Sequence, residues 1–160
     1  MKEVEKYVIN QEKSKARLSV NLSLLLVAFT IFTFIATINP DMLAKEIFLT
    51  LQLVCAIPLL LASTLARSKL VYSGERKRFS VFAFVTFLVA YTFLINSIGI
   101  LLFSLVSSFV AWIFFGINII TAVSYSAIEV SYNKSNLKER IIKDVAFIIL
   151  IVILGILPVL

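Results

Sequence analysis

The strongest constraint on the fold is an uncharged stretch from Phe79 to Ile128, bounded by Arg78 and Glu129. As one straight helix, these roughly 50 residues would reach about 75 Å at about 1.5 Å per residue. The hydrocarbon core of a bilayer is only about 30 Å thick. We therefore expect the stretch to double back as a tight transmembrane hairpin with its turn at Phe103 and Ser104. Its two ends then lie on the same side of the membrane.

The composition extends this expectation to the whole chain. Of its 160 residues, 61% are hydrophobic and 15% charged, with a mean hydropathy of +1.04, far from the soluble norm. We expect an all-α integral membrane protein with four transmembrane helices, a short fifth and a tight central transmembrane hairpin. The expected domains are a cytoplasmic N-terminal polar helix at 1–17 and a single bundle at 18–160, with spans at 18–38, 47–66, 79–103, 105–128 and 145–160.

Prolines and length decide the details of these spans. Pro40 follows Asn39 and precedes Asp41, and should end the first span, whereas Pro58 should kink the second. The segment 145–160 is short for a span, so two interpretations stay open, a fifth span or a half-inserted helix. We favour the span because the preceding residues Ile141 and Ile142 add apolar length.

The distribution of Lys and Arg predicts the orientation. Of the 15 Lys and Arg residues, only Lys45 falls on the side opposite the N-terminus. Because Lys and Arg accumulate in cytoplasmic loops, we expect the N-terminus and both basic loops in the cytoplasm and the C-terminus outside.

Small and polar residues recur at helical spacing in each of the first four spans. In hydrocarbon, helices associate through such residues, so we expect these stripes to face the bundle interior and the Phe-, Leu-, Ile- and Val-rich faces to meet lipid. The stripes are Ser19, Ser23, Thr30, Thr33 and Thr37; Gln52, Ala56, Leu59, Ser63 and Ala66; Ala83, Ala90, Ser97 and Ser104; and Ala111, Asn118, Ala122 and Ser126.

Three amides are the strongest candidates for a polar site. Gln52 and Asn96 should lie at a similar depth near the outer face, with Asn118 near the midplane. Each amide either bonds across a helix interface or, together with Ser126, lines a water-filled path. Asn118 is the first choice for a constriction, because Ala111, Ala122 and Ser126 on its stripe leave room beside it.

The loop after the second span is the most basic part of the chain. It either holds an anionic lipid head group or only enforces topology. Its candidate residues are Arg67, Lys69, Arg76, Lys77 and Arg78.

Several function classes lack support in the sequence. Histidine is absent, and the single cysteine, Cys55, lies in an apolar segment, where we expect it to pack. No carboxylate lies at membrane depth, which disfavours proton-coupled transport. No metal-ligand spacing, phosphate loop or catalytic set occurs, so we expect no enzyme, no cofactor and no metal. The basic charge fits lipid better than nucleic acid.

Two functions therefore compete. The first is a small homo-oligomeric ion channel or pore-type membrane effector, with the path between protomers because five helices seldom enclose one. The second is a non-conducting membrane anchor or regulatory subunit for a cytoplasmic protein partner. Carrier-type transport would need two related halves, and no internal repeat supports it.

Overall fold

The structure is a computed structural model that describes residues 2–73, 77–132 and 137–160. The long elements in these ranges are all helices. Four of these helices are long and apolar enough to cross a membrane, as the sequence predicts. The elements are α1 (Lys2–Ile38), α2 (Pro40–Lys45), α3 (Ile47–Ser73), α4 (Lys77–Leu105), α5 (Ser108–Tyr132), α6 (Leu137–Ile151), the π-helical segment η1 (Val152–Ile156) and the 3₁₀ segment η2 (Leu157–Val159).

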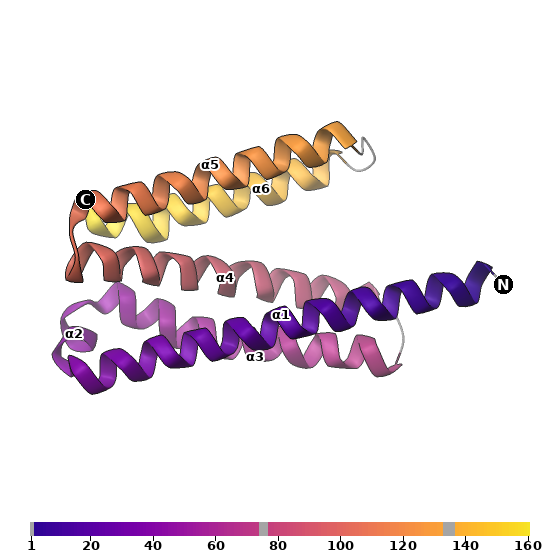
Figure 1. Ribbon diagram of the computed structural model, residues 1–160, viewed down its shortest axis with the longest axis horizontal. Helices are drawn as coiled ribbons and strands as arrows, with labels where there is room; N and C mark the ends of the chain where they lie inside the picture. Colours follow the sequence, from indigo (N-terminus) through magenta and orange to yellow (C-terminus); the bar gives the residue numbers. More distant parts are fainter. Residues whose placement is uncertain (1, 74–76, 133–136) are drawn as a thin grey trace.

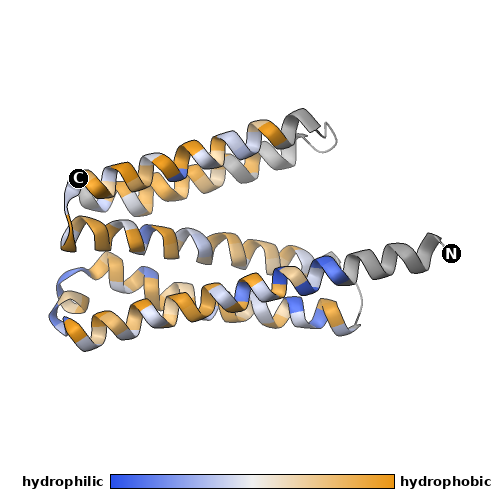
Figure 2. Ribbon diagram, in the orientation of Figure 1, coloured by the Kyte–Doolittle hydropathy of each residue, from blue (hydrophilic) through white to orange (hydrophobic). Residues whose placement is uncertain are grey.

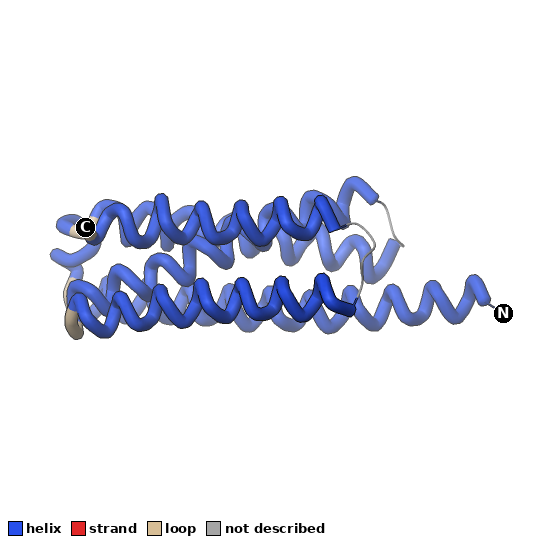
Figure 3. The backbone as a smooth tube through the Cα atoms, turned by 90° about the horizontal axis from the view of Figure 1, so that it is seen from above, coloured by secondary structure: helices blue, strands red, loops and turns tan. Residues whose placement is uncertain are grey.

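The long helices lie side by side and run alternately up and down (Figures 1 and 3). The N-terminal end of α1 lies at the same end of the bundle as the end of α3, the start of α4, the end of α5 and the start of α6. The short helix α2, the turn from α4 to α5 and the C-terminus lie at the opposite end. Apolar residues dominate the lengths of the helices (Figure 2), whereas strongly polar ones gather mainly at the two ends.

The N-terminal segment differs from the prediction of a separate polar helix followed by a span. Residues Lys2–Ile38 form one continuous helix of 37 residues. No Gly or Pro precedes Pro40, so nothing in the sequence interrupts the hydrogen-bond ladder between the charged and the apolar parts. Pro40 then begins α2 at a first-turn position, where its missing N–H costs little.

The central helical hairpin is present, but its turn lies at Val106 and Ser107 rather than at Phe103 and Ser104. Ser107 precedes α5, and its hydroxyl accepts a hydrogen bond from Val110 N at 3.3 Å. A serine that accepts from the third N–H of a helix is an N-cap. The cap therefore fixes the start of α5 at Ser108.

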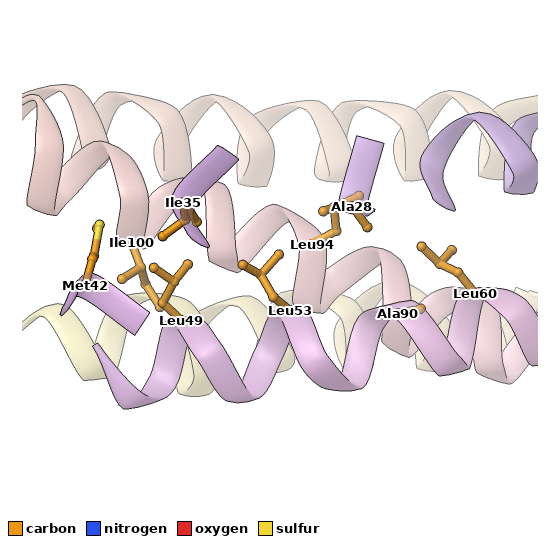
Figure 4. Packing of buried hydrophobic residues seen from close by; sticks show 9 residues of the cluster. All are labelled: Ala28, Ile35, Met42, Leu49, Leu53, Leu60, Ala90, Leu94 and Ile100. Carbon is orange, nitrogen blue, oxygen red and sulfur yellow. The ribbon is translucent and has the colours of Figure 1, made fainter. Parts of the chain in front are cut away.

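The apolar core lies among α1, α3 and α4, and α3 packs most extensively against α4. Figure 4 shows its buried side chains pointing toward one another between these helices. The cluster comprises Ala28, Ile35, Met42, Leu49, Leu53, Leu60, Ala90, Leu94 and Ile100. On α4, Ala83, Ala90 and Ser97 are buried at the predicted seven-residue spacing, which confirms this part of the stripe as an inward face. The fourth member, Ser104, is exposed and donates to Glu46 Oε1 at 3.0 Å.

The stripe of α1 was predicted on the wrong face. Within residues 12–38 of α1, whose burial the structure describes, the buried residues are Asn21, Ala28 and Ile35, also at seven-residue spacing. Every member of the predicted stripe is exposed: Ser19, Ser23, Thr30, Thr33 and Thr37. Thr30 bonds back to Leu26 O of its own helix at 2.9 Å, so its hydroxyl needs no partner helix.

Two further details of α3 differ from expectation or refine it. Cys55 is exposed rather than packed. Pro58 lies inside α3, which runs without a break from Ile47 to Ser73.

At the C-terminus, the apolar run Val145–Ile156 is shorter than the four long helices, so the interpretation of 145–160 as a span stays a prediction.

Candidate functional site

Two of the three amides singled out in the sequence meet the same C-terminal segment. Gln52 of α3 donates through Nε2 to Leu154 O at 2.6 Å, and Asn96 of α4 donates through Nδ2 to Leu150 O at 3.3 Å. Gln52 is 4% exposed and Asn96 fully buried. The two amides therefore tie α6 and η1 to α3 and α4.

The local sequence explains why Leu154 O is free to accept this bond. In an α-helix it would pair with the N–H four residues later, but that residue is Pro158, which has no N–H. The helix widens here into η1, where Leu157 N bonds to Val152 O five residues back. A side chain from another helix thus satisfies the carbonyl that proline leaves unpaired.

The side-chain oxygens of these two amides lie in an unusual environment. Gln52 Oε1 and Asn96 Oδ1 are buried and have no hydrogen-bond partner among the described residues. A Cβ placed on Gly155 would overlap Asn96 Oδ1 and lie 2.8 Å from the Phe115 ring. Glycine at this position therefore lets the backbone of η1 approach the Asn96 side chain closely.

Asn118 and Ser126 lie in a different environment. Both are half-buried on α5, and Asn118 donates to Phe114 O of its own helix at 2.8 Å. The structure does not bring them to Gln52 or Asn96. Their role as pore-lining residues stays a prediction.

The basic candidates separate into buried and exposed residues. Arg67 is only 6% exposed, and its guanidinium carbon lies 5.6 Å from the Phe87 ring centroid. Lys69 is exposed with its Nζ 5.2 Å from the Phe79 ring centroid, and Arg78 is exposed. Lys77 begins α4, and Arg76 lies outside the described residues.

Sequence reasoning did not single out Asn21, which completes the environment of Arg67. With its amide oxygen toward α3, Asn21 accepts from Arg67 Nε at 3.3 Å and donates to Arg17 O at 3.2 Å. The same oxygen lies 2.7 Å from Ser63 Oγ, whose single proton is donated either to it or to Ala83 O, also at 2.7 Å. The seven-residue spacing of Asn21, Ala28 and Ile35 is the sequence pattern that could have identified Asn21 as a residue of the inward face.

A shallow groove runs along the outer face of α1. It is lined by Phe29, Thr30, Thr33, Phe34, Thr37 and Ile38. The groove therefore places three hydroxyl-bearing residues of the predicted stripe on the outside of the chain.

No protein-family model, no curated protein and no solved structure matches this chain.

Proposed function

We propose that this protein is a multi-pass integral membrane protein that assembles with copies of itself into an ion channel or pore-type effector. The N-terminus and basic loops face the cytoplasm and the C-terminus faces outside. The observation that carries the proposal is the exposed hydroxyl stripe of α1, which runs from Ser19 to Thr37 along almost the whole apolar part of that helix.

Among the described residues, the space between α1, α3 and α4 is filled by side chains. Leu53 and Leu60 are fully buried between α1 and α4, and Ala28 and Ala90 close the remaining space. We therefore place the path between copies, on a face that the monomer leaves uncovered. Closed rotational symmetry would bring the same face of each copy around one axis.

The chemistry of the stripe fits such a path. Thr30, Thr33 and Thr37 line the outer groove of α1, where their hydroxyls can contact water while their methyl groups pack between helices. Ser19 and Ser23 continue the stripe toward the predicted cytoplasmic side. Hydroxyls without carboxylates favour a neutral, water-filled path over a proton relay.

Ion flux through purified protein in liposomes under an applied potential tests the proposal. Thr33→Val and Thr37→Val remove one hydroxyl each without enlarging the side chain, and should lower flux several-fold. Thr92→Val is the matched control, because Thr92 is fully buried and bonds to Leu88 O of its own helix at 2.8 Å. Flux that ignores the α1 substitutions, or that stays at the level of empty liposomes, contradicts the proposal.

A second function, a membrane anchor or regulatory subunit for a cytoplasmic protein, has its own supporting observation. The 37 residues of α1 extend about 55 Å at about 1.5 Å per residue, beyond the roughly 30 Å of a bilayer core. The N-terminal end of α1 projects past the other helices (Figure 1). Liposomes without flux, combined with a cytosolic protein that is retained by full-length protein but not after deletion of residues 2–11, favour this function.

A further inference from the structure

The buried arginine of α3 stands apart from the proposed pore. Arg67 is 6% exposed, and no Asp or Glu among the described residues forms an ion pair with it. A buried charge without an opposite charge is strongly destabilising. The positive charge of Arg17 on α1 lies close enough to act on Arg67, which adds repulsion rather than compensation.

The protein holds this guanidinium in place but leaves most of its donors unused. With the amide oxygen of Asn21 turned toward α3, Arg67 Nε donates to it at 3.3 Å, and Phe87 covers the guanidinium at 5.6 Å. An arginine carries five N–H donors, and those of the two terminal nitrogens bond no acceptor among the described residues. Among the described side chains, only Gln52 and Asn96 have a polar atom that is both fully buried and without a hydrogen-bond partner. The terminal nitrogens of Arg67 also have no partner, so they are not fully buried and keep some accessible surface.

The position of Arg67 in the bundle indicates what meets these donors. Arg67 lies about two turns before the end of α3 at Ser73, on the end of the bundle that carries the N-terminus of α1. Arg17 lies directly before the apolar segment that begins at Leu18. In a bilayer, this level is the boundary between hydrocarbon and head groups, where phosphate oxygens are the abundant anionic acceptors.

We propose that Arg67 and Arg17 bind the phosphate of an anionic phospholipid of the cytoplasmic leaflet, with Asn21 and Phe87 positioning Arg67. A planar guanidinium matches two phosphate oxygens at once, which a lysine cannot do. This site rests on the membrane placement in the proposed function but not on channel activity. It explains why, among the described residues, an amide and an aromatic ring rather than a carboxylate contact this buried arginine.

Native mass spectrometry of the full-length protein, released from detergent with equal amounts of phosphatidylglycerol and phosphatidylcholine, tests the site. The wild-type protein should retain phosphatidylglycerol preferentially, and Arg67→Gln should lower that retention about tenfold. Lys13→Gln is the control, because Lys13 is an exposed basic residue of α1 outside the candidate lipid-binding residues. Equal retention by Arg67→Gln and Lys13→Gln overturns the proposal.

A second pair of variants protects the test against misfolding of Arg67→Gln. Arg17→Gln changes an exposed residue and should lower phosphatidylglycerol retention, whereas Lys15→Gln, also exposed on α1, should not. Equal effects of the two variants would mean nonspecific charge attraction and overturn the site.

The source of the phosphate is settled by melting temperature in phosphatidylcholine nanodiscs. Phosphatidylglycerol should raise the melting temperature, and inorganic phosphate alone should not. A rise with inorganic phosphate alone would overturn the lipid assignment. Lipid retention and melting temperature can be measured whether or not the protein conducts ions. Failure of the proposed channel and failure of this lipid site are therefore distinguishable.

Discussion

At the residue scale, one proline and two amides set the conformation of the C-terminal segment. Pro158 removes the N–H that would satisfy Leu154 O, and Gln52 supplies a donor at 2.6 Å instead. Asn96 donates to Leu150 O one turn earlier. The backbone irregularity of η1 is therefore tolerated because neighbouring helices satisfy it.

This pairing predicts a measurable coupling between Gln52 and Pro158. Gln52→Leu leaves Leu154 O without its donor and should lower the free energy of unfolding by about 0.6 to 1.7 kcal/mol, the range for interhelical hydrogen bonds in membranes. In a Pro158→Ala background, the new N–H can satisfy Leu154 O, so the cost of Gln52→Leu should shrink. Unfolding in mixed detergent measures all four corners of this double-mutant cycle. Equal costs in both backgrounds would show that Leu154 O does not depend on Gln52.

The glycines give a second residue-scale prediction. A Cβ on Gly155 would overlap Asn96 Oδ1 and crowd Phe115, whereas a Cβ on Gly116 meets nothing within 4 Å. Gly155→Ala should therefore lower the free energy of unfolding by about 1 to 3 kcal/mol through overpacking. Gly116→Ala, the control, should be neutral or stabilise its helix by up to about 1 kcal/mol. Similar melting temperatures for the two variants would contradict the close packing of η1 on α4.

At the element scale, the sequence predicted the inward face of α4 but not that of α1. On α4, Ala83, Ala90 and Ser97 are small residues, and close approach to α3 buries them. On α1, the spacing of the Ser and Thr residues predicted that their face points inward. The buried face is instead the one that carries Asn21 and Ala28. Periodicity identifies a face that differs from its surroundings, but it does not say whether that face meets its own chain, another copy or solvent.

The candidate site was predictable only in part for a related reason. Gln52 and Asn96 were expected at a similar depth, and both contact the C-terminal segment. Their acceptors could not be predicted, because Leu150 O and Leu154 O are backbone atoms whose availability depends on Pro158 and on how α6 packs. Arg67 was assigned to a solvated loop because α3 was expected to end at Ala66, and it continues to Ser73.

The interface between α3 and α4 yields the element-scale prediction. Ala90 is fully buried there, so Ala90→Leu should force the helices apart and cost about 1 to 3 kcal/mol of unfolding free energy. Val85→Leu adds volume on the same helix at a position that is 50% exposed, and should cost little. Thermal unfolding followed by circular dichroism compares the two. Greater destabilisation by Val85→Leu would place the interface of α4 on its other face.

At the scale of the whole molecule, the fold consists of a packed unit of α1, α3 and α4 flanked by the hairpin of α5 and α6 (Figure 1). The outer face of α1 and most of α5 remain uncovered within one chain. Lipid alone can cover the apolar face of α5, where Ile113 and Ile117 are exposed. The exposed hydroxyls of α1 are the feature that a second copy explains better, and they carry the proposed assembly.

The most direct test of this account is cross-linking of single cysteines in native membranes. In a Cys55→Ser background, cysteines placed singly at Thr30, Thr33 and Thr37 are treated with a short bifunctional thiol reagent, with Ile113→Cys on α5 as the control. Assembly through the outer face of α1 predicts covalent oligomers from the α1 positions and only monomers from Ile113→Cys. Monomers at all three α1 positions, or oligomers from Ile113→Cys alone, would contradict a pore lined by α1.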